Sequence, residues 1–234
     1  MGYGAGHRVC NRAGDGMIVY IGGHGAVGGK GSQVELVRSN DNLGFMFTPF
    51  DAIKEYRGRY AFDNGAFSAY VNGFEFNDEA FLKAFRRLAF NADFIVLPDK
   101  VAAGKKSLNY SLLWRDFLPE GYRYYLAIQD GMTYEMVLDQ IRNRNLIDGI
   151  FIGGTMDWKQ KTAETWIRVA HNIGLKCHIG RVGTAKGLQW AERIGADSVD
   201  SSNFAQHEKN WIELIAYLKG NQRRLSGVVE KAVE

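Results

Sequence analysis

The sequence predicts a single-domain (β/α)8 TIM barrel of the α/β class. Short apolar segments alternate along the chain with longer amphipathic segments, and this alternation is typical of parallel strands connected by helices. The apolar segments are almost continuously hydrophobic, as expected for strands that are covered on both faces. A barrel of this kind takes about 250 residues, and the chain has 234. The alternative is an open, doubly wound sheet.

Eight apolar segments are predicted to be strands, because glycine, proline or polar residues bound each of them. In chain order they are residues 17–22, 45–49, 59–63, 94–99, 124–130, 149–154, 176–181 and 197–200. A glycine-rich loop follows the first segment and lacks the phosphate-binding spacing G-x-x-x-x-G-K-[ST], since Gly31 follows Lys30.

Five segments between the strands are predicted to be helices, from their apolar periodicity and their end signals. They are residues 77–90 after an Asn cap, 133–145 and 184–194 after Thr caps, 160–173 before Gly174, and 207–219 before Gly220. The connections between the first three strands are not assigned. A glycine-rich segment (about 1–16) and a basic tail (about 220–234), either mobile or a short helix, flank the single barrel domain 1–234.

Composition restricts the class of protein. The chain carries 29 Lys and Arg against 26 Asp and Glu, and this small positive surplus is compatible with a nucleic-acid partner. Cys10 and Cys177 lie far apart, which argues against a disulfide framework and a cysteine-based zinc site. No apolar run approaches the roughly 18 residues of a membrane span, and the N-terminus lacks an apolar signal core. We therefore expect a cytoplasmic protein.

Polar residues and glycines recur where the predicted strands end. They are Asp63, Asp99, Gln129, Gly153, Gly154, Arg181 and Asp200. In a barrel these ends meet at one mouth, where barrel enzymes hold their active sites. Each aspartate alone is equally compatible with a turn or a helix cap, and DSVDSSN around Asp200 has the composition of an N-cap. The barrel prediction favours a shared site.

The predicted mouth has the chemistry of glycosyl transfer. Two adjacent carboxylates cannot both ionise freely, so one becomes an ionised nucleophile and the other a protonated acid, as in retaining glycoside cleavage. Asp200 and Asp63 are the candidate pair. Asp99 and Gln129 offer the donors and acceptors that recognise a planar heterocycle. Gly153 and Gly154 would let backbone N–H groups approach a ligand oxygen closely.

Basic residues follow several predicted strand ends, and we expect three of them, Arg181, Lys159 and Lys186, to contact nucleic acid. The alternative for each is a solvated helix surface. His24, His171 and His178 show no metal-ligand spacing, so we expect ordinary packing or hydrogen bonding of these histidines and no metal or other cofactor.

An ordered set of motifs over about residues 59–203 resembles the tRNA-guanine transglycosylase superfamily. The motifs are DNGAF, FIVLPD, LAIQDG, GIFIGGT, HIGRVGT and GADSVDSS. They are most similar to the compact phage-type members that insert 7-deazaguanine derivatives into DNA. The resemblance implies a (β/α)8 pentosyltransferase that exchanges guanine for a free deazaguanine base, such as 7-cyano-7-deazaguanine, without breaking the strand.

The resemblance also implies residue roles. Asp200 matches the nucleophile, Asp63 the general acid/base and Asp99 the base-binding aspartate, while Gln129 and the backbone of Gly153–Gly154 match the remaining base contacts. The chain lacks the Cys/His zinc site of the tRNA enzymes and is shorter, which favours DNA over RNA as partner. Ser201 stands where phage members often have Gly. An RNA-directed enzyme, a barrel enzyme acting on a small glycoside or phosphosugar, and a non-catalytic deazaguanine-binding protein are the alternatives.

Overall fold

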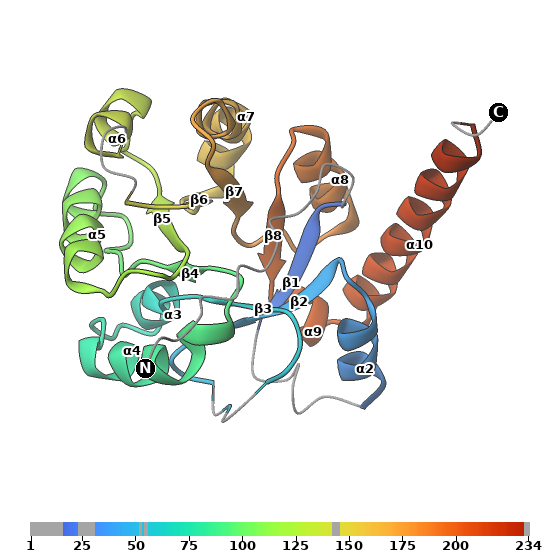
Figure 1. Ribbon diagram of the computed structural model, residues 1–234, viewed down its shortest axis with the longest axis horizontal. Helices are drawn as coiled ribbons and strands as arrows, with labels where there is room; N and C mark the ends of the chain where they lie inside the picture. Colours follow the sequence, from blue (N-terminus) through green and yellow to red (C-terminus); the bar gives the residue numbers. More distant parts are fainter. Residues whose placement is uncertain (1–15, 23–30, 52, 54–55, 142–145, 232–234) are drawn as a thin grey trace, which may run out of the picture.

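The computed structural model confirms the closed (β/α)8 barrel. Eight parallel strands pair in chain order from β1 to β8, and β8 returns to pair with β1 (Figure 1). The structure describes residues 16–22, 31–51, 53, 56–141 and 146–231, with only the backbone of 31–33 and 221–231. Within these residues, no helix has the length and apolar character needed to cross a membrane.

All eight predicted strands are confirmed, since each observed strand overlaps its predicted segment. The strands are β1 (Ile18–Gly22), β2 (Leu43–Phe47), β3 (Tyr60–Phe62), β4 (Ile95–Val96), β5 (Tyr124–Ile128), β6 (Gly149–Ile152), β7 (Lys176–Ile179) and β8 (Ser198–Ser201).

The five predicted helices are also present, together with helices that the sequence did not assign. The helices are α2 (Gly31–Ser39), α3 (Ala66–Val71), α4 (Asp78–Leu88), α5 (Lys105–Phe117), α6 (Tyr134–Ile141), α7 (Met156–Asn172), α8 (Ala185–Arg193), α9 (Asn203–Gln206) and α10 (Glu208–Lys231), with a 3-10 turn η1 (Ala89–Asn91). Helix α7 begins before the predicted residue 160, because the Thr155 side chain caps it by accepting from the Trp158 N–H.

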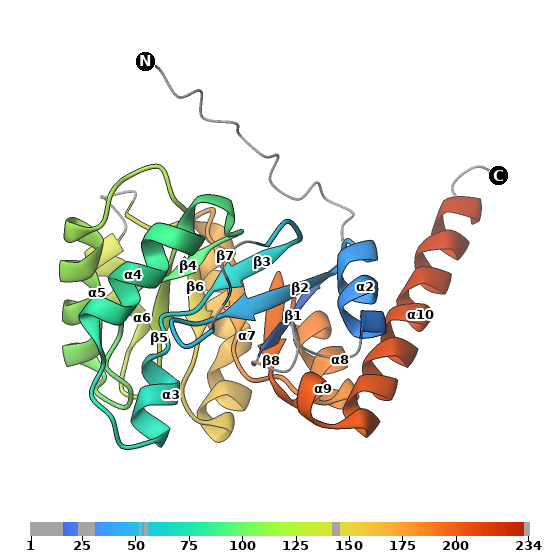
Figure 2. The ribbon, with the colours of Figure 1, turned by 90° about the horizontal axis from the view of Figure 1, so that it is seen from below.

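The end predicted for the last helix at Gly220 is wrong, because α10 continues through this glycine to Lys231. A glycine inside a helix costs only about 1 kcal/mol, and the first half of α10 lies against α8 and α9. The second half extends away from the barrel (Figures 1 and 2). The glycine-rich segment predicted at about 1–16 lies almost wholly outside the described residues.

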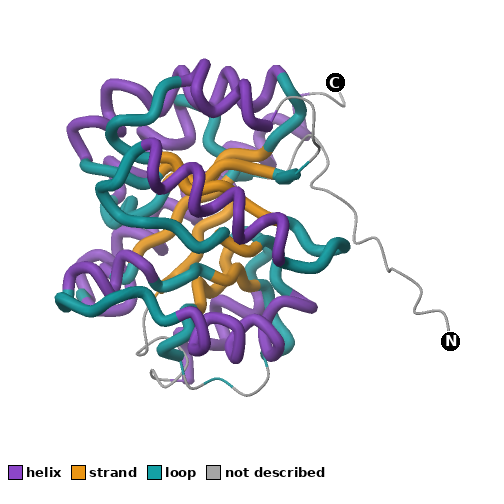
Figure 3. Tube along the Cα trace, turned by 90° about the vertical axis from the view of Figure 1, so that its left-hand side faces the viewer, coloured by secondary structure: helices purple, strands orange, loops and turns teal. Residues whose placement is uncertain are grey.

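The strand side chains form two apolar clusters, because successive residues of a strand point to opposite faces. One set, which includes Val19 and Phe45, packs outward against the helices that surround the strands (Figure 3). The other set, which includes Tyr20, Ala61 and Ala127, fills the interior of the barrel. A side chain two positions after an interior residue therefore points into the barrel, towards the mouth.

Candidate active site

Strand alternation places three of the predicted site residues inside the barrel at the carboxyl ends of their strands. Asp63 lies two residues after the interior Ala61, and Gln129 lies two residues after Ala127. Asp200 lies within β8, where its Oδ1 is 2.9 Å from the Nε2 of the interior His178. These positions support a common mouth built from β3, β5 and β8.

Asp200 is held by groups from the end of β7. Its side chain is 15% exposed, so it is mostly removed from water but still reachable. Besides the contact with His178, Oδ1 accepts the Arg181 backbone N–H at 3.3 Å. Both bonds go to the same oxygen, and within the described residues no hydrogen bond reaches Oδ2. One carboxylate oxygen therefore remains available to a ligand.

The structure does not support the helix-cap alternative for Asp200. Ser202 occupies the N-cap position of α9, and no side chain caps this helix. Ser201 instead orders the turn, because its Oγ accepts the Asn203 N–H at 3.1 Å.

Asp63 has an unusual protonation equilibrium. Burial, followed by the negative charges of Asp200 and Asp99, raises the pKa of its carboxyl group to about 7. The Gly65 N–H, 3.1 Å from Oδ2, acts in the opposite direction. At neutral pH the protonated form of Asp63 is therefore well populated beside Asp200.

Asp99 is the third carboxyl group of this cluster. Burial raises its pKa to about 6, while the hydrogen bond from Asn64 lowers it. Asn64 Nδ2 lies 2.9 Å from Asp99 Oδ1, and Gln129 Nε2 lies 3.4 Å from Oδ2. The structure thus brings Asp99 and Gln129 together, as the sequence predicted.

Gln129 makes its hydrogen bonds within the protein. Its Oε1 accepts the Ala102 N–H at 2.5 Å, and its Nε2 donates to Ser107 Oγ at 2.8 Å and to the Lys100 carbonyl at 2.9 Å. The amide therefore holds the loop between β4 and α5 beside Asp99. A contact of Gln129 with a base stays a prediction, and it requires some of these bonds to exchange.

The glycine pair after β6 has two different environments. The Gly153 N–H donates to the Ile128 carbonyl at 2.9 Å and so already belongs to the sheet. Gly154 has φ +73°, and a Cβ at this position would lie 2.4 Å from Asp130 Oδ2. Glycine is thus needed for the turn that brings Gly154 against Asp130. The predicted backbone contacts of both glycines with a ligand stay predictions.

Lys159 does not lie on the surface predicted for nucleic-acid binding. Its side chain is fully buried, and Nζ donates to the Gly180 carbonyl at 2.5 Å. Burial, followed by the positive charge of Arg181, lowers the pKa of the ammonium group to about 8. Lys159 therefore supports the end of β7 from α7 rather than offering a charge to a phosphate.

Arg181 and Lys186 remain exposed near the mouth. Arg181 has φ 60°, donates from its guanidinium to the Gly154 carbonyl, and places its Cζ 4.2 Å from the ring centre of Phe67. Because Phe67 follows β3 and Arg181 follows β7, this contact crosses the mouth. Lys186 lies in the first turn of α8. Their contacts with nucleic acid stay predictions.

His178 is the site residue that the sequence did not identify. It is fully buried, with Nε2 next to Asp200 and Nδ1 2.9 Å from Ser198 Oγ. The available signal was its position in β7, between the outward-facing Cys177 and Ile179. A polar side chain at an inward position of an otherwise apolar strand indicates a partner inside the barrel.

Within the described residues, one group of potential metal ligands lies away from the mouth. His171, Cys177 and Asp197 meet at the start of β7 and β8. Asp197 also accepts from Lys176 Nζ at 2.7 Å and from the Cys177 N–H at 2.8 Å. Burial raises the pKa of the Cys177 thiol, which disfavours the thiolate that a metal requires. In the structure the Asp197 carboxylate is instead engaged by hydrogen bonds to Lys176, the Cys177 backbone and His171.

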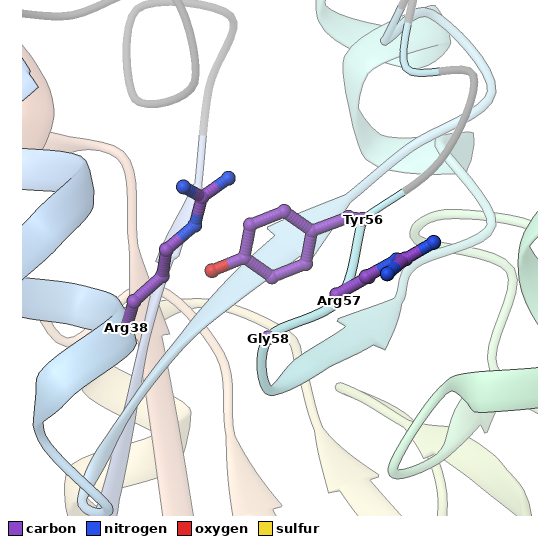
Figure 4. Close-up of a pocket in the computed structure, with 4 residues that line it drawn as sticks. All are labelled: Arg38, Tyr56, Arg57 and Gly58. Atoms are coloured by element: carbon purple, nitrogen blue, oxygen red, sulfur yellow. The ribbon is translucent and has the colours of Figure 1, made fainter.

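A cavity of about 470 Å³ lies on the outer side of the barrel wall (Figure 4). It is lined by Arg38 from α2 and by Tyr56, Arg57 and Gly58. Tyr56 packs against the outward-facing Phe45, so the cavity does not open into the barrel interior. The cavity is therefore separate from the carboxylate cluster.

No protein-family model and no curated protein matches the chain. The features that bear on function are therefore the barrel and the geometry of its mouth. That geometry combines a carboxylate with one available oxygen, Asp200, and a carboxyl group whose pKa is about 7, Asp63. Such a pair can supply a nucleophile and a general acid/base in one site.

Proposed function

We propose that the protein is a guanine transglycosylase that replaces guanine in DNA with a 7-deazaguanine derivative. The observation that carries the proposal is the unequal carboxyl pair: Asp200 presents a hydrogen-bonded carboxylate, and its charge contributes to the raised pKa of Asp63. The TIM-barrel fold is typical of enzymes, and the pair lies at the ends of β3 and β8 where barrel enzymes act. The motif resemblance supports the substrate class.

The proposed reaction begins with a deoxyguanosine flipped out of the DNA stack, which costs a few kcal/mol. Asp200 Oδ2 attacks C1′ of the deoxyribose and forms a C1′–O bond as the C1′–N9 bond breaks. The bond electrons leave with guanine, and protonated Asp63 donates the proton that neutralises the departing base. The product of this step is a covalent glycosyl-enzyme.

The second step reverses the first with a different base. Ionised Asp63 takes the N9 proton of the deazaguanine, and N9 then attacks C1′ and displaces the Asp200 carboxylate. Two displacements retain the configuration at C1′. The step returns both aspartates to their starting protonation states, so the proposed exchange balances without an oxidant or reductant.

The direct test is mass spectrometry of nucleosides after DNA is incubated with the enzyme and 7-cyano-7-deazaguanine. We expect the deazaguanine nucleoside in DNA and a covalent protein–DNA adduct on denaturing gels. Asp200→Ala should lose both signals. Asp157→Ala is the matched control, because Asp157 is 76% exposed and pairs with Lys161 at the surface of α7. Exchange of labelled base by Asp200→Ala would show that the assignment is wrong.

The same assay separates the alternatives. Incorporation into RNA but not DNA would indicate an RNA-directed enzyme. Release from small glycosides without any polymer product would indicate a small-molecule enzyme. Equal binding of the deazaguanine by wild type and Asp200→Asn, without exchange, would indicate a binding protein.

A further inference from the structure

His178 bridges two inward positions of the neighbouring strand. It pairs in register with Ser198 between β7 and β8, and Asp200 lies two residues further along β8. Its Nδ1 is 2.9 Å from Ser198 Oγ, and its Nε2 is 2.9 Å from Asp200 Oδ1. Both ring nitrogens therefore have one partner each, and both partners belong to the strand that carries Asp200.

Aromatic rings fix the plane of this imidazole. Phe151 stacks on it with 4.7 Å between ring centres and 21° between planes, while Phe94 and Tyr20 lie at 5.2 and 5.9 Å. Gly180 leaves room for the stacked ring, because a Cβ there would lie 2.7 Å from Phe151. The ring is thus held in one orientation by packing as well as by hydrogen bonds.

Titratable side chains from three elements, α7, β8 and β1, surround His178. Burial lowers the pKa of the imidazole most, Asp200 from β8 opposes this shift, and the ammonium of Lys159 from α7, the smallest of these effects, lowers the pKa. Tyr20 from β1 directs its hydroxyl away, to Asp93 Oδ2 at 2.8 Å. The ring is therefore neutral at neutral pH and carries a single N–H.

The partners determine which nitrogen carries that hydrogen. An ionised carboxylate only accepts hydrogen bonds, so the N–H belongs on Nε2, facing Asp200. Nδ1 is then an acceptor, and the Ser198 hydroxyl can donate to it. A neutral donor orients a carboxylate and leaves its negative charge in place, whereas an imidazolium would neutralise it.

We propose that His178 is a positioning residue for Asp200: the Ser198 hydroxyl fixes the Nε2–H tautomer, and this N–H holds Oδ1 so that Oδ2 points to the reacting carbon. The assignment rests on the proposed function, because it takes Asp200 as the nucleophile. It adds a chain of hydrogen bonds from Ser198 through His178 to Asp200. His178 itself does not touch the substrate.

The kinetic test compares His178→Leu, which removes the donor, with His178→Gln, which can place an amide N–H near the position of Nε2. We expect His178→Leu to lower kcat for base exchange about 10–100-fold, because loss of orientation on the order of 1 Å costs that much, with KM little changed. His178→Gln should recover part of the rate. His171→Gln is the matched control, since His171 Nε2 lies 2.8 Å from Asp197 at the other end of the barrel. A folded His178→Leu variant with the wild-type rate would overturn the proposal.

The second test does not depend on activity. Nitrogen-15 NMR of the histidine-labelled full chain, with His178→Gln used to assign the signal, should show protonated Nε2 and unprotonated Nδ1 across neutral pH. Ser198→Ala should increase the fraction with the hydrogen on Nδ1. A wild-type Nδ1–H tautomer, or an imidazolium at neutral pH, would overturn the proposal. If wild type shows no base exchange, the proposed function fails, and the NMR result still decides the state of His178.

Discussion

At the scale of single residues, the carboxyl group of Asp63 links the site to the stability of the barrel. Burial and the neighbouring carboxylates raise its pKa from 3.8 to about 7. Between these two pH values the folded state binds more protons than the unfolded state, so the free energy of unfolding falls as pH rises. The contribution of protonated Asp63 is fully present below the unfolded pKa and is lost as pH passes the folded pKa.

Asp63→Asn should remove this pH dependence, because the amide has a similar shape and never ionises. At pH values above the folded pKa we expect the variant to be roughly 2 kcal/mol more stable than wild type, while base exchange is lost. The difference should shrink as pH falls towards 4. Urea unfolding over a pH series measures it, and Asp157→Asn on the exposed surface of α7 is the control. A stability difference that is constant with pH would contradict this origin.

Lys159 gives a residue-scale prediction of opposite sign. Its folded pKa of about 8 lies below the unfolded value of 10.5, so the unfolded state binds more protons between these values. Wild-type stability should therefore gain a contribution as pH rises from 8 towards 10.5, and Lys159→Met should not show this gain. The stability difference between the two proteins, measured by urea unfolding, is expected to grow in favour of wild type over this range. If the stability difference between wild type and Lys159→Met instead narrows as pH rises, the pKa of Lys159 is not lowered by burial.

At the scale of elements, the capping residue of α7 also joins two consecutive loops of the mouth. Thr155 Oγ1 accepts the Trp158 N–H at 3.3 Å and donates to Asp130 Oδ1 at 2.8 Å. Thr155→Ala removes both bonds and should destabilise the protein by about 1–2 kcal/mol. Thr155→Ser keeps the hydroxyl and is the control. Equal losses in thermal or urea unfolding for the two variants would exclude the cap as the cause.

The elements that the sequence predicted are those with local signals. Most of the strands are buried and apolar and are followed closely by polar residues or glycine, and α4 and α8 carry side-chain caps at Asn77 and Thr184. Helices α3 and α5 begin after Gly65 and Gly104 and have no side-chain cap, so their starts carry no such signal. Helix α10 passes Gly220 because packing, rather than local propensity, decides where it ends.

At the scale of the whole molecule, closure of the barrel brings the separate strand ends together at one site. The sequence could place Asp63, Asp99 and Asp200 at strand ends, and the raised pKa values of Asp63 and Asp99 follow from their burial in the same mouth. It could not place Lys159, because a residue in the first turn of α7 is buried or exposed only by the way that helix packs. The inward position of His178 depends on the register of β7 against β8.

The distribution of positive charge over the whole molecule predicts how DNA binding depends on salt. With a formal net charge of +3, the chain has little general attraction for DNA, so affinity depends on the basic residues near the mouth. Each phosphate contact contributes about 0.9 to the slope of log affinity against log salt. Arg181→Ala and Lys186→Ala should each reduce the slope by about 1, because both residues are exposed.

Lys159→Met is the matched control for the salt series, since it removes a positive charge that is fully buried. We expect its slope to equal that of wild type, measured by fluorescence anisotropy with a guanine-containing oligonucleotide. A reduced slope for Lys159→Met would mean that α7 opens to expose this ammonium group to the phosphates. A wild-type affinity that does not change with salt would instead argue against a nucleic-acid substrate, because the phosphate backbone would then contribute nothing to binding.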